Sequence, residues 1–359
     1  MSVPMSTDEF PHQEVVFHHD RDTGLEAIIA IHDTALGPAA GGCRRWVYAN
    51  REAALVDVLR LSKGMTFKNA LAEIPFGGGK SVILAKPGVA VTEAELAAYG
   101  GWIEALGGRY IAAEDVGIRV ADMRVVARQT KFVTGLGQDG FGGDPAPFTA
   151  EGVFIGIQAA METRLGLDDF DGLTVSVQGL GNVGMRLCER LYKAGAKLVV
   201  ADINEQFTQL AAERFAARVV SVNDILQTKA DVFAPCALGA VLTPESVQSL
   251  GARVVAGSAN NQLSDESVAL RLKEAEILYA PDYVINAGGV ISAAHEYLGL
   301  RDASWVSQRI DAIGTRLRDI FARADAQSKS PDQIAEVMAM EILANPSAVG
   351  CDEGASQAQ

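Results

Sequence analysis

Several features that mark other protein classes are missing from this 359-residue chain. Its net charge is −14, so it lacks the basic surface that binds nucleic acids or anionic membranes. No apolar run reaches the ~18 residues that a membrane-spanning helix requires. The first twenty residues show no secretory signal. We therefore expect neither a nucleic-acid nor a membrane partner.

Cysteine and histidine are both scarce. The four cysteines lie far apart with no CxxC pair, a pattern typical of free thiols in a cytoplasmic protein. The five histidines show no HExxH or similar spacing, so no metal site is expected. The 48% hydrophobic and 21% charged residues are typical of a globular protein, and the length allows two domains.

The segment at residues 64–83, GMTFKNALAEIPFGGGKSVI, is the most informative part of the chain. It sets Lys68 and Lys80 among mostly apolar neighbours, and Lys80 follows three glycines. Lysine is costly to bury unless it is paired or uncharged, so the pattern indicates a pocket that binds an anion and keeps one amine near neutrality. The alternative is that both ammonium groups reach solvent past their apolar stems.

The first 145 residues mix strand and helix patterns. Thr92, with Glu95 three residues later, forms a capping box at the start of a helix. The segment LGPAAGGCR at 36–44 is expected to be a loop, and the Gly- and Pro-rich segment at 135–147 a linker. Periodicity predicts strands at 14–19, 25–32, 81–85 and 110–113, and helices at 51–63 and 92–106.

Strands and helices alternate after the linker, which predicts a parallel sheet with helices on both faces. Helical segments then close the chain before a frayed tail, CDEGASQAQ. The predicted strands are 173–178, 196–201, 232–234, 254–256 and 277–280, and the predicted helices are 182–194, 205–215, 287–297, 303–324 and 331–343.

The sequence GLGNVG at residues 179–184 is a GxGxxG pattern between a predicted strand and a predicted helix. Asp202 closes the next strand and completes the dinucleotide-binding fingerprint. The glycines allow a tight turn and let a pyrophosphate approach the helix N-terminus. Asp202 favours NAD over NADP because its carboxylate would repel a 2′-phosphate. The alternative is a glycine-rich turn with a structural role only.

Polar residues at the ends of other predicted strands are further candidates. Glu114 and Asp115 could exchange a proton with a substrate group, or form a helix cap or surface turn. Asn260, Asn261 and Asn286 could fix a polar group of the substrate or the nicotinamide amide, or be ordinary turn residues.

Nine segments between residues 36 and 297 resemble the glutamate, leucine, phenylalanine and valine group of amino acid dehydrogenases, most closely its leucine branch. The resemblance implies an α/β protein with a substrate-binding catalytic domain at 1–145, a Rossmann NAD-binding domain at 146–330 and an active site in the cleft between them. Residues 331–359 would form a C-terminal helix and tail that pack back on the first domain. The segments are LGPAAGGCR, GMTFKNA, FGGGKSVI, GRYIAAEDVG, FVTGL, VQGLGNVG, APCALGA, VVAGSANNQL and LYAPDYVINAGGVI.

The resemblance also implies reversible oxidative deamination of an L-amino acid to a 2-oxo acid and ammonia by a homo-oligomer. Lys68 would hold the substrate carboxylate with the backbone of Gly41 and Gly42. Lys80 would activate the water that attacks the iminium carbon, and Asp115 would move a proton to or from the amino group. The other implied substrate residues are Ala40, Met65, Ala113, Thr134, Asn261 and Val290, and the implied cofactor residues are Thr149, Gly179, Leu180, Gly181, Asn182, Val183, Gly184, Asp202, Ile203, Cys236, Ala237 and Asn260.

The identity of residue 40 bears on substrate choice. Glutamate enzymes of this group carry a lysine there, so Ala40 disfavours an acidic side chain, and the site matches leucine-type sequences at Ala113 and Val290. A branched aliphatic substrate (leucine, valine or isoleucine) is therefore expected. Leucine-type sequences usually have leucine at position 40, and the smaller alanine keeps phenylalanine or another aromatic substrate open. One or two methylenes are worth only ~1–3 kcal/mol, so substrates should overlap.

Two other functional classes are weighed against this one. An NAD-sensing regulator without turnover should have lost Lys80 or Asp115, and both are present. A 2-hydroxy acid dehydrogenase needs a His–Asp pair near an arginine, whereas only His295 lies within a motif-rich segment.

Overall fold

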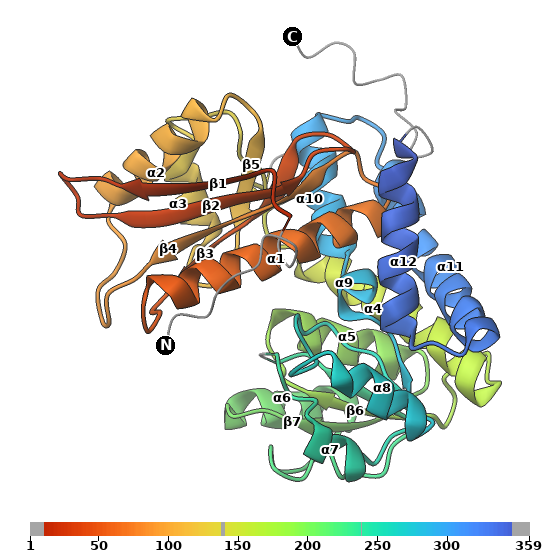
Figure 1. Ribbon diagram of the computed structural model, residues 1–359. Helices are drawn as coiled ribbons and strands as arrows, with labels where there is room; N and C mark the ends of the chain where they lie inside the picture. The colour runs from red at the N-terminus through yellow and green to blue at the C-terminus, as the bar shows by residue number, and fades with distance from the viewer. Residues whose placement is uncertain (1–10, 138–140, 238, 347–359) are drawn as a thin grey trace. The chain divides into compact units, whose positions relative to one another are not determined.

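The computed structural model describes residues 11–137, 141–237 and 239–346, which form two compact units (Figure 1). The first unit comprises the chain up to Asp144, Ser292–Asp302 and the chain from Ala339 on. The second comprises Pro145–Ile291 and Ala303–Met338. The tail CDEGASQAQ, predicted to be frayed, and part of the predicted linker lie outside the described residues. Within the described ranges, no helix is long and apolar enough to span a membrane.

The first unit is built on a five-stranded mixed sheet in the order β1-β2-β4-β3-β5. β1 and β2 pair antiparallel, as do β2 and β4, whereas β3 runs parallel to both β4 and β5. The strands are β1 (Glu14–His19), β2 (Glu26–Asp33), β3 (Ala39–Trp46), β4 (Gly77–Leu84) and β5 (Tyr110–Glu114).

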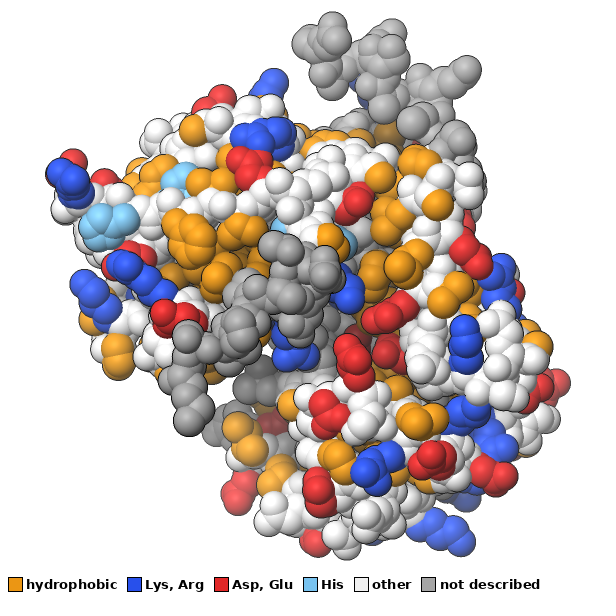
Figure 2. Space-filling model, in the orientation of Figure 1, with side chains coloured by type: hydrophobic (Ala, Val, Ile, Leu, Met, Phe, Trp, Pro, Cys, Tyr) orange, Lys and Arg blue, Asp and Glu red, His pale blue; other side chains and the backbone are white. Residues whose placement is uncertain are grey.

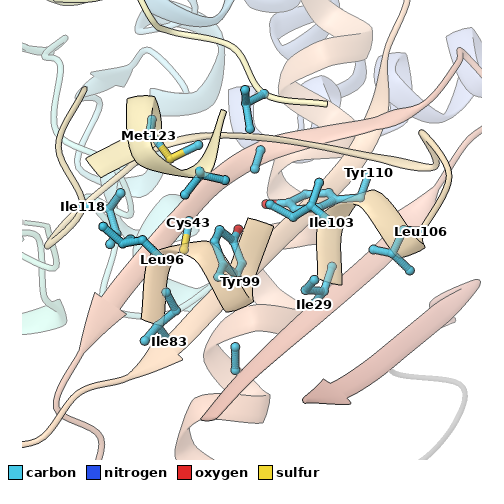
Figure 3. Packing of buried hydrophobic residues seen from close by; sticks show 14 of the residues in the cluster. Ile29, Cys43, Ile83, Leu96, Tyr99, Ile103, Leu106, Tyr110, Ile118 and Met123 are labelled. Atoms are coloured by element: carbon cyan, nitrogen blue, oxygen red, sulfur yellow. The ribbon is translucent and has the colours of Figure 1, made fainter. Parts of the chain in front are cut away.

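Helices cover both faces of this sheet (Figure 1). Side chains alternate along β2, so Ile28 and Ala30 join a core with α1 (Arg51–Leu71). Ile29, between them, packs in the opposite core with α2 (Glu93–Ala105) and α3 (Val120–Val126). Figure 3 shows this second core, where side chains of α2 meet those of the strands. The strands therefore carry apolar residues on both faces.

Two predictions for this unit need correction. The loop expected at residues 36–44 is wrong, because most of it is β3, which lies inside the sheet. Its small residues reflect tight packing, since a Cβ at Gly41 would lie 1.9 Å from the carbonyl oxygen of Gly79. The helix predicted at 51–63 continues to Leu71, through the segment that carries Lys68. The capping box of Thr92 and Glu95 is confirmed.

The second unit contains a six-stranded parallel sheet in the order β11-β10-β9-β6-β7-β8. Numbered from β6, this is the order 3-2-1-4-5-6 of the dinucleotide-binding fold. The strand order reverses between β6 and β9, where ligands bind in such sheets. The strands are β6 (Thr174–Gln178), β7 (Lys197–Ala201), β8 (Arg218–Val219), β9 (Val232–Pro235), β10 (Val254–Val255) and β11 (Leu278–Tyr279).

The helix α4 (Ala146–Leu165) opens the second unit and was not predicted. It is apolar around much of its circumference and carries Gly152 and Gly156, which weakens its helical pattern. A Cβ at Gly156 would lie 2.3 Å from Ile285 Cγ1, so this glycine allows the close packing. The remaining helices are α5 (Asn182–Lys193), α6 (Glu205–Phe215), α7 (Pro244–Gln248), α8 (Ser267–Glu274), α9 (Asp282–Ile285), α10 (Gly288–Leu298), α11 (Ser304–Gln327) and α12 (Pro331–Ala344).

Candidate active site

The first unit gathers several predicted substrate residues on the sheet face that α1 covers. Gly42 pairs with Ala113, and Ala40 pairs with Gly78, two residues before Lys80. Their neighbours Cys43 and Ala112 belong to the core on the opposite face. Because side chains alternate along a strand, Ala40, Gly42 and Ala113 face α1 instead. Residues far apart in the sequence thus share one surface.

Lys80 and Asp115 form an ion pair on this surface. Lys80 Nζ lies 2.9 Å from Asp115 Oδ2, and the two side chains are 8% and 17% exposed. A Cβ at Gly42 would lie 2.7 Å from Asp115 Cβ and 3.2 Å from Lys80 Nζ. Glycine at position 42 therefore leaves room for the pair.

The helix α1 contributes the second lysine. Met65, Lys68 and Asn69 are three and four residues apart, so they share one side of α1. A Cβ at Gly41 would lie 3.1 Å from Met65 Cγ, and Asn69 Nδ2 donates to the Gly77 carbonyl at 2.6 Å. Over the whole residue, Lys68 is 9% exposed and Lys80 6%. Both lysines are buried, so the alternative that they extend into solvent is wrong.

A third charged residue, Arg44, contacts the acid–base pair. Arg44 Nε donates to Asp115 Oδ2 at 3.2 Å. Burial alone would raise the pKa of Asp115, but the positive charges of Lys80 and Arg44 outweigh it and lower that pKa to about 2. Sequence reasoning did not single out Arg44, although an arginine in such an apolar, glycine-rich segment was a usable signal.

Thr134 is held beside β5. Its backbone N–H donates to the Ala112 carbonyl at 2.9 Å, and its hydroxyl donates to the Ala293 carbonyl at 2.7 Å. The carboxylate of Glu296 accepts hydrogen bonds from the backbone N–H groups of Gly135 and Leu136. Glu296, which the sequence did not point to, thereby fixes the segment after Thr134.

The second unit places the GxGxxG segment at the carboxyl end of β6, as the dinucleotide-binding fold requires. Gly179 has φ +92°, which favours glycine, and a Cβ there would lie 2.7 Å from the backbone nitrogen of Ala237. A Cβ at Gly184 would lie 2.0 Å from the Gly179 carbonyl oxygen, so this glycine lets α5 pack against the turn. Cys236 N–H donates to the Gln178 carbonyl at 2.7 Å, so Cys236 and Ala237 adjoin the turn.

Asp202 lies beside the same turn. Its carboxylate accepts hydrogen bonds from the backbone N–H of Leu180 at 2.5 Å and of Asn204 at 2.7 Å. Ile203, the next residue, is 92% exposed, and a Cβ at Gly181 would meet no atom within 4 Å. The turn thus combines open space before the N-terminus of α5 with an acid at the adjacent strand end. Both features fit a dinucleotide.

The asparagines lie on loops of the second unit. Asn286 is buried, and its amide donates to Asn260 Oδ1 at 2.8 Å and to the Ser258 carbonyl at 3.1 Å. Asn286 therefore orients Asn260. Asn261 is exposed with φ +52°, and its carbonyl accepts a hydrogen bond from Ala240 N–H at 2.6 Å.

Thr149 lies in the first turn of α4 and its hydroxyl donates to the Pro145 carbonyl at 3.0 Å. A Cβ at Gly289 would lie 2.9 Å from Thr149 Oγ1. Val290, the residue after Gly289, is half-buried in α10. Thr149 and Val290 thus lie close together in the chain's second unit.

Comparisons with known proteins agree with this architecture. Residues 11–132 match the family model described as Glu/Leu/Phe/Val dehydrogenase, dimerisation domain, and residues 144–206 and 199–344 match the glutamate/leucine/phenylalanine/valine dehydrogenase model. The chain is 45% identical to the leucine dehydrogenase of Geobacillus stearothermophilus over 94% of this chain and 92% of that protein.

Relatives with other substrates are similar to nearly the same degree. The valine dehydrogenase of Streptomyces virginiae is 44% identical over 92% of this chain and 94% of that protein. The crystal structure of L-tryptophan dehydrogenase from Nostoc punctiforme superposes with a TM-score of 0.83 at 41% identity, covering 95% of this chain and 98% of that one. The chain therefore belongs to the Glu/Leu/Phe/Val dehydrogenase family and is an amino acid dehydrogenase.

Proposed function

We propose that the chain catalyses reversible NAD-dependent oxidative deamination of L-amino acids with branched aliphatic side chains: leucine, valine and isoleucine. The observation that carries the proposal is the buried contact of Lys80 with Asp115 beside Gly42. Deamination needs one group that activates water and one that moves the amino proton, and an amine paired with a carboxylate meets both needs.

The substrate residues divide by chemistry. Lys68, buried on α1, supplies a positive charge for the substrate carboxylate, with the backbone of Gly41 and Gly42 assisting. Ala40, Met65, Ala113, Thr134 and Val290 form the site for the side chain, and Asn261 receives the amino group. The small or apolar residues at 40, 65, 113 and 290 favour an apolar side chain, because they offer no charge to an acidic one.

The chemistry converts the amino acid, NAD⁺ and water to the 2-oxo acid, ammonium, NADH and a proton. Lys80 accepts a proton from the water that attacks the iminium carbon of the substrate. Asp115 carries the proton that the departing amino group needs, and takes it back in the reverse direction. A bound nicotinamide supplies the acceptor for the hydride that leaves Cα.

Asp202 supports NAD in preference to NADP. Its carboxylate is held at the end of β7 by two backbone N–H groups, where the adenosine ribose of a dinucleotide lies. A 2′-phosphate there would meet a like charge. The next residues, Ile203, Asn204 and Glu205, include no cation to neutralise it. Thr149 and Asn260 complete the proposed cofactor site near the nicotinamide.

An aromatic substrate is the second candidate. Ala40 is small, and the L-tryptophan dehydrogenase from Nostoc punctiforme resembles this chain at 41% identity over nearly its full length. A single methylene changes selectivity by only ~1–3 kcal/mol, so we expect aliphatic and aromatic substrates to differ modestly in an apolar site.

The proposal includes a homo-oligomer that acts in the cytoplasm. The matched family model is described as a dimerisation domain, and β1 is an edge strand that carries Phe17 at 59% exposure. Figure 2 shows hydrophobic side chains gathered on the face of the first unit that is turned toward the viewer. Exposed apolar patches of this kind mark interaction surfaces. Cys43, Cys188 and Cys236 are free thiols, as a reducing compartment favours.

A panel of 2-oxo acids tests the proposal. Consumption of NADH with ammonium should be fastest with the oxo acids of leucine, valine and isoleucine, slower with phenylpyruvate and slowest with 2-oxoglutarate. Replacing NADH by NADPH should lower kcat/KM. A faster reaction with phenylpyruvate or indolepyruvate would favour the aromatic alternative, and consumption without ammonium would exclude deamination.

A further inference from the structure

The carboxylate of Asp115 is shared between two cations. Its Oδ2 atom lies 2.9 Å from Lys80 Nζ on β4 and 3.2 Å from Arg44 Nε on β3. The Asp115 and Arg44 side chains are each 17% exposed, so water screens these contacts only weakly. The acid of the proposed mechanism therefore has a second charged partner in addition to Lys80.

The other end of the Arg44 guanidinium is held by α1 and the segment before it. Arg44 Nη1 lies 3.1 and 3.3 Å from the two carboxylate oxygens of Asp57. The Tyr48 hydroxyl donates to Asp57 Oδ2 at 2.6 Å. Four charged groups thus alternate in sign, from Lys80 through Asp115 and Arg44 to Asp57. The planar guanidinium, with several donors in a fork, is well suited to contact both carboxylates.

The proposed chemistry explains what such an arrangement is for. Lys80 must lose and regain a proton during each turnover, so its charge is not constant. A carboxylate as buried as Asp115 would lose its compensating charge whenever the amine became neutral, and would then retain the proton that it has to pass on. A guanidinium remains charged at every working pH, so Arg44 can compensate Asp115 continuously.

We propose that Arg44 is a positioning residue that keeps Asp115 correctly oriented and returns it to its ionised form after each proton transfer while Lys80 changes its charge, and that Asp57 and Tyr48 hold Arg44 in place. The inference rests on the proposed function and extends it to residues outside the proposed substrate and cofactor sites. Asp57 acts only through Arg44, because no contact of Asp57 with Lys80 or Asp115 is observed among the described residues.

The electrostatics agree with the geometry. Burial alone would lower the pKa of Arg44, but Asp115 and Asp57 raise it, so the guanidinium stays charged. The charged neighbours of Asp115 are Lys80, Arg44 and the preceding residue, Glu114. Burial raises the pKa of the nearby Cys43 thiol to about 11, and it raises those of the Tyr48 and Tyr110 hydroxyls, so these groups carry no charge in the working range.

The test compares Arg44→Gln with Arg45→Gln in the intact protein. Arg45 is the next residue on β3 and its side chain donates to the Val89 carbonyl, so the control removes the same charge from the same strand. Arg44→Gln should lower kcat about 100-fold, since a displaced catalytic group costs about that much. It should change KM for the 2-oxo acid less than about threefold, because Lys68 is untouched.

The pH profile separates positioning from a structural role. Loss of a nearby positive charge makes acidic groups hold their protons more tightly, so the rising limb of kcat against pH should move up by about one unit in Arg44→Gln. Arg44→Lys restores a charge without the fork, so it should return the limb towards its original pH and restore kcat only in part. Arg45→Gln should change neither the position of the rising limb nor kcat.

The proposal would be overturned if the rising limb of kcat against pH moved by one unit in Arg45→Gln, or if it did not move in Arg44→Gln. Asp57→Asn provides an independent test if Arg44→Gln does not fold: it should lower kcat about tenfold, and full activity would contradict a role for the network. In a doubly substituted Arg44→Lys/Asp57→Asn protein, the Asp57 effect should vanish. Inactive wild-type protein would count against the proposed function, whereas active wild-type protein with unaffected Arg44 variants would count against this inference alone.

Discussion

The two sites of this molecule are built differently. The dinucleotide turn of the second unit uses six consecutive residues, Gly179–Gly184, and the acid at the end of the next strand. The acid–base site of the first unit draws its groups from β3, β4, α1 and the end of β5. Lys80 and Asp115 touch although 35 positions separate their numbers in the sequence. One site is local in the chain, and the other exists only after folding.

This difference indicates which changes should disturb which property. Changes at the local turn should alter cofactor affinity and choice, because the turn belongs to the proposed dinucleotide site. Changes in the assembled site should alter kcat, because the groups that move protons depend on one another's charge and position.

Removing the amine should give the largest effect. Lys80→Met deletes the group that we propose activates water, so kcat should fall about 10⁴-fold. Lys193→Met, which removes an amine that is 73% exposed, serves as the control and should keep full turnover. Steady-state rates with 4-methyl-2-oxopentanoate, ammonium and NADH measure both. Wild-type kcat in Lys80→Met would refute its assigned role.

The second-largest effect is expected from a single methyl group added at position 42. Gly42→Ala would place its Cβ 2.6 Å from the Glu114 carbonyl oxygen and 2.7 Å from Asp115 Cβ, so the acid–base pair must shift. We expect kcat to fall about 100-fold. Gly101→Ala is the matched control, because a Cβ there meets no atom within 4 Å. It should keep its activity and gain about 0.5–1 kcal/mol of stability in α2, as thermal melting can show.

The ion pairs of Asp115 should also make the free energy of unfolding depend on pH. The pKa of Asp115 is lowered from 3.8 to about 2 in the folded chain, so its contribution is fully present above pH 4 and is lost as pH falls towards 2. Urea unfolding should show the wild-type protein losing about 2 kcal/mol more than Asp115→Asn over that range. The exposed Asp168→Asn control should follow the wild type, and identical slopes in all three proteins would contradict the shift.

The smallest expected effect concerns cofactor choice. Asp202→Asn removes the charge that opposes a 2′-phosphate, so the ratio of kcat/KM for NADPH to that for NADH should rise about tenfold. Saturating kcat with NADH should stay within about twofold. Asp168→Asn again controls for the change in net charge. A lower kcat without a change in cofactor ratio would place Asp202 outside the ribose site.

The same contrast explains what the sequence could predict. The GxGxxG turn was recognisable because its requirements are local: a strand, a tight turn and a helix in succession. β1 and α6 have the bounds that periodicity predicted. The capping box of Thr92 and Glu95 is equally local, and the structure confirms it.

What the sequence could not predict depends on distant contacts. β3 was predicted to be a loop because its alanines and glycines are common in loops, whereas they are small here because neighbouring strands approach closely. Arg44 lies 71 residues from Asp115 and 13 from Asp57, so no local spacing reveals their network. The helix α4 was missed because its apolar residues surround it, which removes the one-sided pattern of a surface helix.

The separation of chemistry from cofactor binding is tested most directly by the NADH affinity of Lys80→Met, measured by fluorescence titration. Our account predicts a Kd within about twofold of the wild type, because Lys80 belongs to the first unit's acid–base pair. A Kd raised tenfold or more would show that the lysine helps to hold the cofactor, and would contradict the account.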